Sequence, residues 1–199
     1  MVLPTVAVSS PEGVRTAILR FVERFGRPVV LYIKEEKYVT VEVARALFHA
    51  GALSWIKYAV VRNDPSADPL LQELCHCIDP KFIVSGIGEQ PAVVHLPKFR
   101  LGGFTSGCVC VAPKLSMDLL RALAAGNSVQ ADLIRSRFHP LEALRNQHGP
   151  IPVLHEAVAQ TGIADPGPIQ PLLCPPLETV RSQIATAANA LLVEERQAR

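Results

Sequence analysis

The sequence predicts an α/β fold in which short strands of a parallel sheet alternate with helices. Short apolar runs recur along residues 1–126, and segments with helical spacing of apolar residues separate them. The runs are apolar on both faces, as strands of a parallel sheet are when both faces are buried. After Gly126 the strand signal stops and the rest of the chain looks helical. These features fit either a doubly wound sheet or part of a (β/α)8 barrel.

The predicted elements follow one another with clear boundary signals. The first helix has Ser10 as a candidate N-cap, Pro11 at its first position and Gly26 at its end. Two later helices also end at a glycine, Gly51 and Gly126. Strands are expected at 1–8, 28–34, 54–61, 81–88 and 102–112. Helices are expected at 9–26, 40–50, 68–78, 91–99, 115–125, 129–147, 152–161 and 177–192.

Composition and charge narrow the class of protein. The chain has 199 residues, of which 49% are hydrophobic and 19% charged, so it is long enough and apolar enough to form a globular core. A net charge of +2 without a basic run gives no support for nucleic acid or an anionic membrane as a partner. No apolar run approaches the roughly 20 residues of a membrane helix, and residues 1–10 lack the features of a signal peptide. A cytoplasmic location is therefore expected.

The five cysteines form two C-x-C pairs and one single residue. Cys75 and Cys77 fall on a predicted helix, where positions i and i+2 do not face each other. Cys108 and Cys110 fall on a predicted strand, which would place both sulfurs on one face, where a metal could bind. Zinc spacings are absent from the sequence. We favour free cysteines that pack as small hydrophobic residues, and we expect no metal site.

Lys57 lies inside an apolar strand, and this is an unusual place for a lysine. The pleat puts Lys57 on the same face as Trp55 and Ala59, so its surroundings are apolar. Desolvation disfavours the ammonium form and lowers the pKa, and a neutral amine can form a Schiff base with a ketone. The alternative is a structural lysine that extends to solvent or pairs with a carboxylate such as Glu35 or Glu89.

A tyrosine and two groups of small residues lie near the ends of the neighbouring strands. Tyr32 is on the opposite pleat from Leu31 and Ile33, where its phenol could move protons beside an imine, or it could be an ordinary core tyrosine. Residues 85–89 and 105–107 combine glycines with hydroxyl side chains. Such segments let a ligand approach the backbone and could hold a carboxylate, or they could be tight turns.

The order of these motifs resembles a known family. A strand with L-Y is followed by a strand with I-K, then by S-G-x-x-E, G-F-x-S and P-I-P-V-L-H. This order is similar to that of the dihydrodipicolinate synthase and N-acetylneuraminate lyase family of class I aldolases, over nearly the whole chain. The resemblance implies a (β/α)8 TIM barrel, of which the chain holds strands 4–8 and a C-terminal helical tail. It also implies a partial barrel at residues 1–126 and a helical extension at 127–199.

The resemblance implies roles for six residues. Lys57 would be the lysine that forms a Schiff base with pyruvate or another 2-oxo acid, and Tyr32 would relay protons. Gly86 and Thr105 would meet the pyruvyl part of the substrate.

Glu89 and Ser106 would contact the polyhydroxy tail of a sugar acid, as in lyases of this family. This chemistry needs no cofactor. The family also suggests a homo-oligomer, either a dimer or a tetramer.

Two departures from the family pattern limit the substrate and the activity. The N-x-P-G-R-like segment that follows the tyrosine in the synthases is replaced here by residues 33–37, and Ala59 stands where sugar-acid lyases often have a threonine. A 2-oxo acid other than the two best-known substrates is therefore expected, such as a deoxy sugar acid. The first three strands of the family, which carry a G-x-x-G-E carboxylate-binding segment, are missing, so we expect little turnover by the isolated chain.

Three functions remain open from the sequence. The first is a Schiff-base lyase or aldolase that acts on pyruvate or a related 2-oxo acid. The second is a 2-oxo sugar-acid dehydratase on the same scaffold. The third is a truncated relic or interaction module without catalysis. Because the remaining elements keep the family order, we expect that the natural N-terminus is missing from this sequence.

Overall fold

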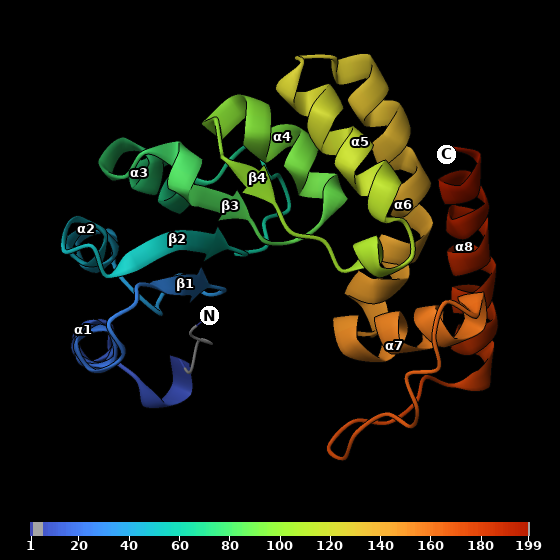
Figure 1. Cartoon of the computed structure of the whole chain (residues 1–199), viewed down its shortest axis with the longest axis horizontal. Coiled ribbons are helices and arrows are strands. Elements are labelled where there is room, and N and C mark those ends of the chain that lie inside the picture. Colours follow the sequence, from blue (N-terminus) through green and yellow to red (C-terminus); the bar gives the residue numbers. More distant parts are fainter. Residues whose placement is uncertain (2–5, 199) are drawn as a thin grey trace. The chain divides into compact units, whose positions relative to one another are not determined.

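The computed structural model describes residue 1 and residues 6–198, and its described strands form one four-stranded parallel sheet (Figure 1). The strands are β1 (Val29–Ile33), β2 (Leu53–Tyr58), β3 (Ile83–Ser85) and β4 (Gly103–Phe104), and they lie in the order β1-β2-β3-β4. Each strand therefore pairs with the next one along the chain, as in a (β/α)8 barrel. A doubly wound sheet would reverse its order at a switch point, and no reversal occurs among the described strands.

Eight α-helices surround or follow the sheet in the described part of the chain. The predicted helices are all present, and the first three begin at the side-chain caps Ser10, Thr40 and Asp68, which accept hydrogen bonds from backbone N–H groups. The helices are α1 (Pro11–Phe25), α2 (Val41–His49), α3 (Pro69–Cys77), α4 (Glu89–Phe99), α5 (Pro113–Ala124), α6 (Ser128–His148), α7 (Pro150–Thr161) and α8 (Glu178–Gln197). None of the described helices has the length and apolarity needed to cross a membrane.

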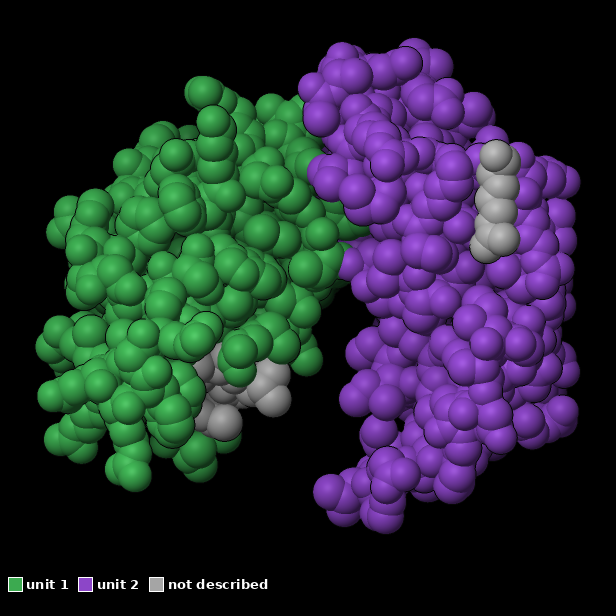
Figure 2. Space-filling model, viewed as in Figure 1, with its two compact units in different colours: residues 1–87, 94–105 green, residues 88–93, 106–199 purple. Residues whose placement is uncertain are grey.

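The chain forms two compact units, coloured green and purple in Figure 2. The sheet unit comprises Met1–Ile87 and Val94–Thr105, and the helical unit comprises Gly88–Val93 and Ser106–Arg199. Helix α4 contributes residues to both units. The predicted boundary at residue 126, between a partial barrel and a helical extension, remains a prediction.

The two faces of the sheet differ in burial. One face is almost completely buried, because it packs against apolar residues of α1, α2 and α3. The opposite face is only half-buried in the described structure. The buried face carries Leu31, Ile33, Ile56, Tyr58, Ile83 and Ser85, and the half-buried face carries Val30, Tyr32, Trp55, Lys57 and Val84. A reactive group on the half-buried face is therefore accessible, while the other face of its strand packs against the helices.

In the helical unit, two helix N-termini are capped by glutamates from distant helices. Glu195 of α8 accepts hydrogen bonds from the N–H groups of Lys114 (3.0 Å) and Leu115 (2.9 Å) at the start of α5. Glu142 of α6 accepts hydrogen bonds from the N–H groups at the start of α4, from Glu89 at 3.1 Å and Gln90 at 3.2 Å. The side-chain oxygens of both glutamates satisfy backbone donors that the helices leave without a partner.

The predicted strand at 102–112 is wrong for most of its length. Only Gly103–Phe104 forms a strand, and Cys108–Cys110 forms a 3-10 helix, η3. The Ser106 hydroxyl accepts a hydrogen bond from the N–H of Val109 (3.2 Å), which closes a local turn in place of a strand ladder. Cys108 and Cys110 are therefore not on one face of a strand. In the described residues, no group of three or more His, Cys, Asp or Glu side chains could hold a metal ion.

The other strand predictions are partly wrong at their ends. Residues 2–5 of the predicted first strand lie outside the described residues, and Val6–Val8 form a 3-10 helix, η1. These three residues have no neighbouring strand in the described sheet to supply ladder hydrogen bonds. The predicted strand at 81–88 is reduced to β3, because Pro80–Phe82 form a 3-10 helix, η2, whose first turn is capped by Asp79. Strand β2 ends at Tyr58. This residue pairs with Ile33, the last residue of β1.

Candidate active site

Lys57 and Tyr32 are direct neighbours in the sheet. Tyr32 on β1 pairs in register with Lys57 on β2, so both side chains project from the half-buried face. The Lys57 Nζ atom lies 4.6 Å from the centroid of the Tyr32 ring. An ammonium at this distance is attracted to the ring face, and the phenol of the same ring lies on the same face of the sheet as the amine.

The surroundings of Lys57 destabilise its charged form. Burial lowers the pKa of Lys57 below its ordinary value of 10.5, and it raises the pKa of Tyr32 above 10.0. Within the described residues of the sheet unit no carboxylate forms an ion pair with Lys57, so the predicted alternative of pairing with Glu35 does not occur there. Pairing with Glu89, which belongs to the helical unit, remains a prediction. On the same face, Trp55 pairs with Val30, and both are half-buried.

Gly86 and Thr105 lie at the carboxyl ends of the next two strands. Gly86 follows β3, and its N–H donates a 2.6 Å hydrogen bond to the carbonyl oxygen of Tyr58. Thr105 follows β4, and its N–H donates a 2.8 Å hydrogen bond to the carbonyl oxygen of Ser85. In (β/α)8 barrels the active site is built at this end of the strands. The sheet unit thus brings four of the six predicted residues to one end of the sheet.

A side chain at position 86 would clash with the stem of Lys57. A Cβ atom at position 86 would lie 2.9 Å from Lys57 Cγ, 2.9 Å from the Tyr58 carbonyl oxygen and 3.0 Å from Ala59 Cβ. These separations are too short for a side chain without movement of the strands. The absence of a Cβ at position 86 therefore leaves room for the stem of Lys57.

Glu89 and Ser106 belong to the helical unit, and they contact each other. The Ser106 hydroxyl donates to Glu89 Oε2 at 2.7 Å, and the Ser116 hydroxyl donates to Glu89 Oε1 at 2.8 Å. Glu89 is completely buried, and burial raises its pKa. Both carboxylate oxygens therefore have partners within the helical unit. Whether Glu89 and Ser106 bind substrate remains a prediction.

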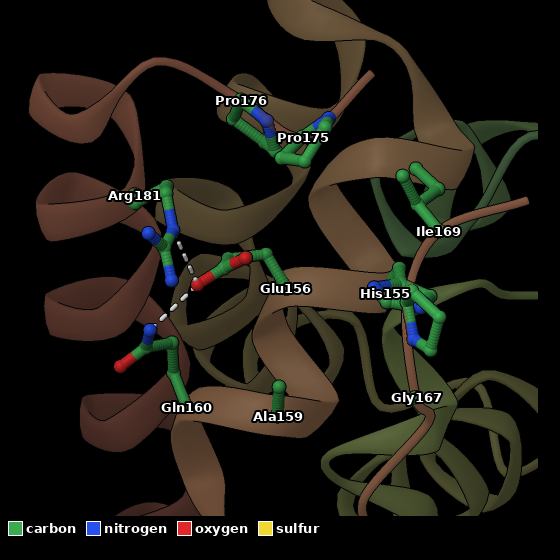
Figure 3. Close-up of a pocket in the computed structure, with 10 residues that line it drawn as sticks. His155, Glu156, Ala159, Gln160, Gly167, Ile169, Pro175, Pro176 and Arg181 are labelled. Carbon is green, nitrogen blue, oxygen red and sulfur yellow. Dashed lines mark hydrogen bonds and ion pairs between the residues drawn. The ribbon is translucent and has the colours of Figure 1, made fainter. Parts of the chain in front are cut away.

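The helical unit also contains a cavity of about 380 Å³ that none of the predicted site residues lines (Figure 3). Glu156 of α7 is at its polar side, where Oε1 accepts hydrogen bonds from Arg181 Nε (3.0 Å) and Gln160 Nε2 (2.6 Å). Ile169, Pro175 and neighbouring residues of the loop before α8 form the apolar side. The Arg181–Glu156 pair joins α7 to α8, so the polar side of this cavity has a structural role.

Several solved structures with the same architecture are structures of dihydrodipicolinate synthases. A dihydrodipicolinate synthase from Bacillus clausii superposes with a TM-score of 0.75 at 22% identity, over 94% of this chain and 62% of that chain. The synthase from Oceanobacillus iheyensis gives 0.75 at 23% identity, over 99% and 63%. The synthase from Agrobacterium tumefaciens gives 0.78 at 21% identity, over 92% and 62%. The chain shares the fold of dihydrodipicolinate synthases.

The likeness to the synthases is one of fold, and it covers only part of their length. The chain spans less than two thirds of each of these three structures. No protein-family model matches the sequence, and no curated protein matches it. The strand order and the likeness in fold to the synthases show that the four parallel strands are a part of a (β/α)8 TIM barrel. The prediction of a partial barrel is confirmed.

Sequence reasoning missed the residues that lie behind the site. Tyr58 and Asp68 form a buried hydrogen bond directly behind Lys57, and Ser85 and His95 form another behind Gly86. A tyrosine next to Lys57 in the sequence was a signal for the first pair. The second pair joins a strand to a helix ten residues later, and no local pattern indicates it.

Proposed function

We propose that the chain is part of a class I aldolase or lyase that acts on pyruvate or a related 2-oxo acid. The observation that carries the proposal is the Lys57 amine, 4.6 Å from the Tyr32 ring centroid at the carboxyl end of paired barrel strands. The lowered pKa of Lys57 supports the proposal, because only the neutral amine attacks a carbonyl.

The proposed reaction begins with addition of the Lys57 amine to the C2 ketone of the 2-oxo acid. The resulting carbinolamine loses water and becomes a protonated imine, and Tyr32 supplies and removes the protons that these steps require. In the cleavage direction, a substrate hydroxyl loses its proton, a C–C bond breaks, an aldehyde leaves, and the electron pair moves into the imine to give an enamine. Protonation and hydrolysis then release the 2-oxo acid and restore the amine.

Gly86 and Thr105 would flank the bound substrate in this proposal. Gly86 leaves space beside Lys57, and Thr105 offers a hydroxyl for which no hydrogen bond within the described residues is found. We also propose a cytoplasmic location and a homo-oligomer. The segment at residues 33–37 differs from the synthase pattern, which favours an aldehyde partner other than that of the synthases.

Trapping with borohydride tests the proposal. Incubation of the chain with pyruvate and sodium borohydride should give a stable mass gain on the peptide that contains Lys57. Lys57→Ala should abolish the gain, whereas Lys98→Ala should keep it, because Lys98 lies in the last turn of α4 and not on a strand of the sheet. A folded wild-type sample without the adduct, or an adduct that persists in Lys57→Ala, would refute the proposed function.

A further inference from the structure

Four buried polar side chains lie on the face of the sheet opposite to Lys57. Tyr58 and Ser85 are register partners on β2 and β3, and Asp68 and His95 come from the helices behind them. All four are at most 2% exposed. Polar groups are costly to bury unless they form hydrogen bonds, so a fully apolar layer would be the simpler way to pack this face.

Tyr58 is anchored through Asp68 to the start of α3. Its hydroxyl lies 2.8 Å from Oδ1 and 2.7 Å from Oδ2 of Asp68. Asp68 also accepts hydrogen bonds from the N–H of Leu71, which caps α3, and from Arg62 Nη2 at 3.0 Å. Arg62 in turn pairs with Glu36 in the segment that follows β1. The ends of β1 and β2 are thus tied to a helix through one buried carboxylate.

Ser85 anchors β3 to α4 in the same layer. Its hydroxyl lies 2.9 Å from Nδ1 of His95, and the bond is buried. Ser85 immediately precedes Gly86, the residue that leaves space for the Lys57 stem. The His95 ring also packs edge-on against Tyr58, with centroids 6.5 Å apart. The two anchored strands therefore share one hydrogen-bonded layer behind the candidate site.

We propose that the Tyr58–Asp68 and Ser85–His95 pairs are a positioning device for the Lys57 amine. Successive residues of a strand point to opposite faces, so fixing Tyr58 and Ser85 fixes the direction of Lys57 and the position of Gly86. Hydrogen bonds between these side chains favour one arrangement of the layer, whereas an apolar layer tolerates small slips. One atom of the layer, His95 Nε2, has no hydrogen-bond partner among the described residues. The catalytic meaning of this device rests on the proposed function, but the positional claim does not.

The test compares Tyr58→Phe with the wild-type chain by two measurements. The first is the pKa of Lys57, followed by ¹³C NMR after reductive methylation of the lysines. The second is the rate of borohydride trapping with pyruvate. In Tyr58→Phe the Lys57 side chain should be free to move toward solvent, which should raise its pKa toward the ordinary value. Trapping should slow by roughly tenfold, because small misplacements of reacting groups are costly.

Two further variants separate positioning from stability. Ile18→Val removes a buried methyl from α1 and should lower stability without changing either measurement on Lys57. Asp68→Asn keeps a good helix cap but loses the charge that holds Arg62, so it should change both measurements in the same direction as Tyr58→Phe. If Tyr58→Phe does not fold, the measurements on Asp68→Asn decide whether the pairs position Lys57.

The outcomes distinguish this inference from the proposed function. A Lys57 pKa in Tyr58→Phe or Asp68→Asn that equals the wild-type value would overturn the positioning role, whatever the loss of stability. A failure of pyruvate to label wild-type Lys57 would refute the proposed function, and the NMR measurement would still decide the positioning role.

Discussion

Gly86 lies against Lys57 so closely that a Cβ at position 86 would be 2.9 Å from Lys57 Cγ. The two residues are on adjacent strands, and the hydrogen bond from Gly86 N–H to the Tyr58 carbonyl oxygen fixes their separation. The glycine and the lysine therefore act as one structural feature of the candidate site. A residue with a side chain at position 86 must displace either the lysine or the strand.

Gly86→Ala should reduce the reactivity of Lys57 and destabilise the sheet unit. Overpacking of this kind costs about 1–3 kcal/mol. Chemical unfolding measures the loss of stability, and pyruvate trapping measures the loss of reactivity. Gly103→Ala is the matched control, because a Cβ at position 103 of the same sheet has no neighbour within 4 Å. Equal behaviour of the two variants would contradict the steric explanation.

Tyr32→Phe should slow Schiff-base formation without changing the pKa of Lys57 greatly. The ring that faces the amine remains, but the phenol that would move protons is lost, and general acid–base catalysis contributes about 10²–10⁴-fold. Stopped-flow trapping with pyruvate measures the rate. Tyr38→Phe, at another buried tyrosine of the sheet unit, should keep the wild-type rate. A Tyr32→Phe chain that is as fast as wild type would exclude the phenol as the relay.

The stability of the helical unit should fall as the pH rises toward neutrality. Burial, with a further contribution from the charge of Glu89, raises the pKa of Glu142 from 4.5 to about 7. The folded state therefore holds a proton that the unfolded chain releases near pH 4.5, so this stabilisation is present below pH 4.5 and is lost as the pH rises through about 7.

Urea unfolding of wild type and Glu142→Gln at pH 5 and pH 8 measures this effect. The wild-type chain should lose more stability between these two values than the variant, because glutamine does not titrate. An identical change in both chains would mean that Glu142 does not hold the proton.

Glu195→Ala should destabilise the helical unit by about 0.5–2 kcal/mol, the usual cost of losing a helix cap. The substitution leaves the N–H groups of Lys114 and Leu115 without their acceptor at the start of α5. Glu194→Ala is the control, because Glu194 is more exposed and its carboxylate pairs with Arg137 at 3.3 Å instead of capping a helix. Thermal unfolding of the two variants should give a clearly lower midpoint for Glu195→Ala alone.

The local sequence determined most of the helices and the location of the candidate lysine. Ser10, Thr40 and Asp68 are strong caps, and they begin α1, α2 and α3 as the pattern predicts. The apolar strand around Lys57 also predicted correctly that Lys57 would be partly desolvated. These features depend on residues close together in the chain, so a local pattern contains the information.

Tertiary structure decided the features that depend on partners far away in the chain. Glu142 and Glu195 accept hydrogen bonds from helix N–H groups 53 and 81 residues earlier, and nothing near either glutamate in the sequence indicates this. Residues 106–110 do not form the predicted strand, because the Ser106 hydroxyl accepts a hydrogen bond from a local N–H group and a turn forms instead. Periodicity placed an amine inside an apolar strand. Only the parallel register, set by hydrogen bonds between separate strands, placed it beside a phenol.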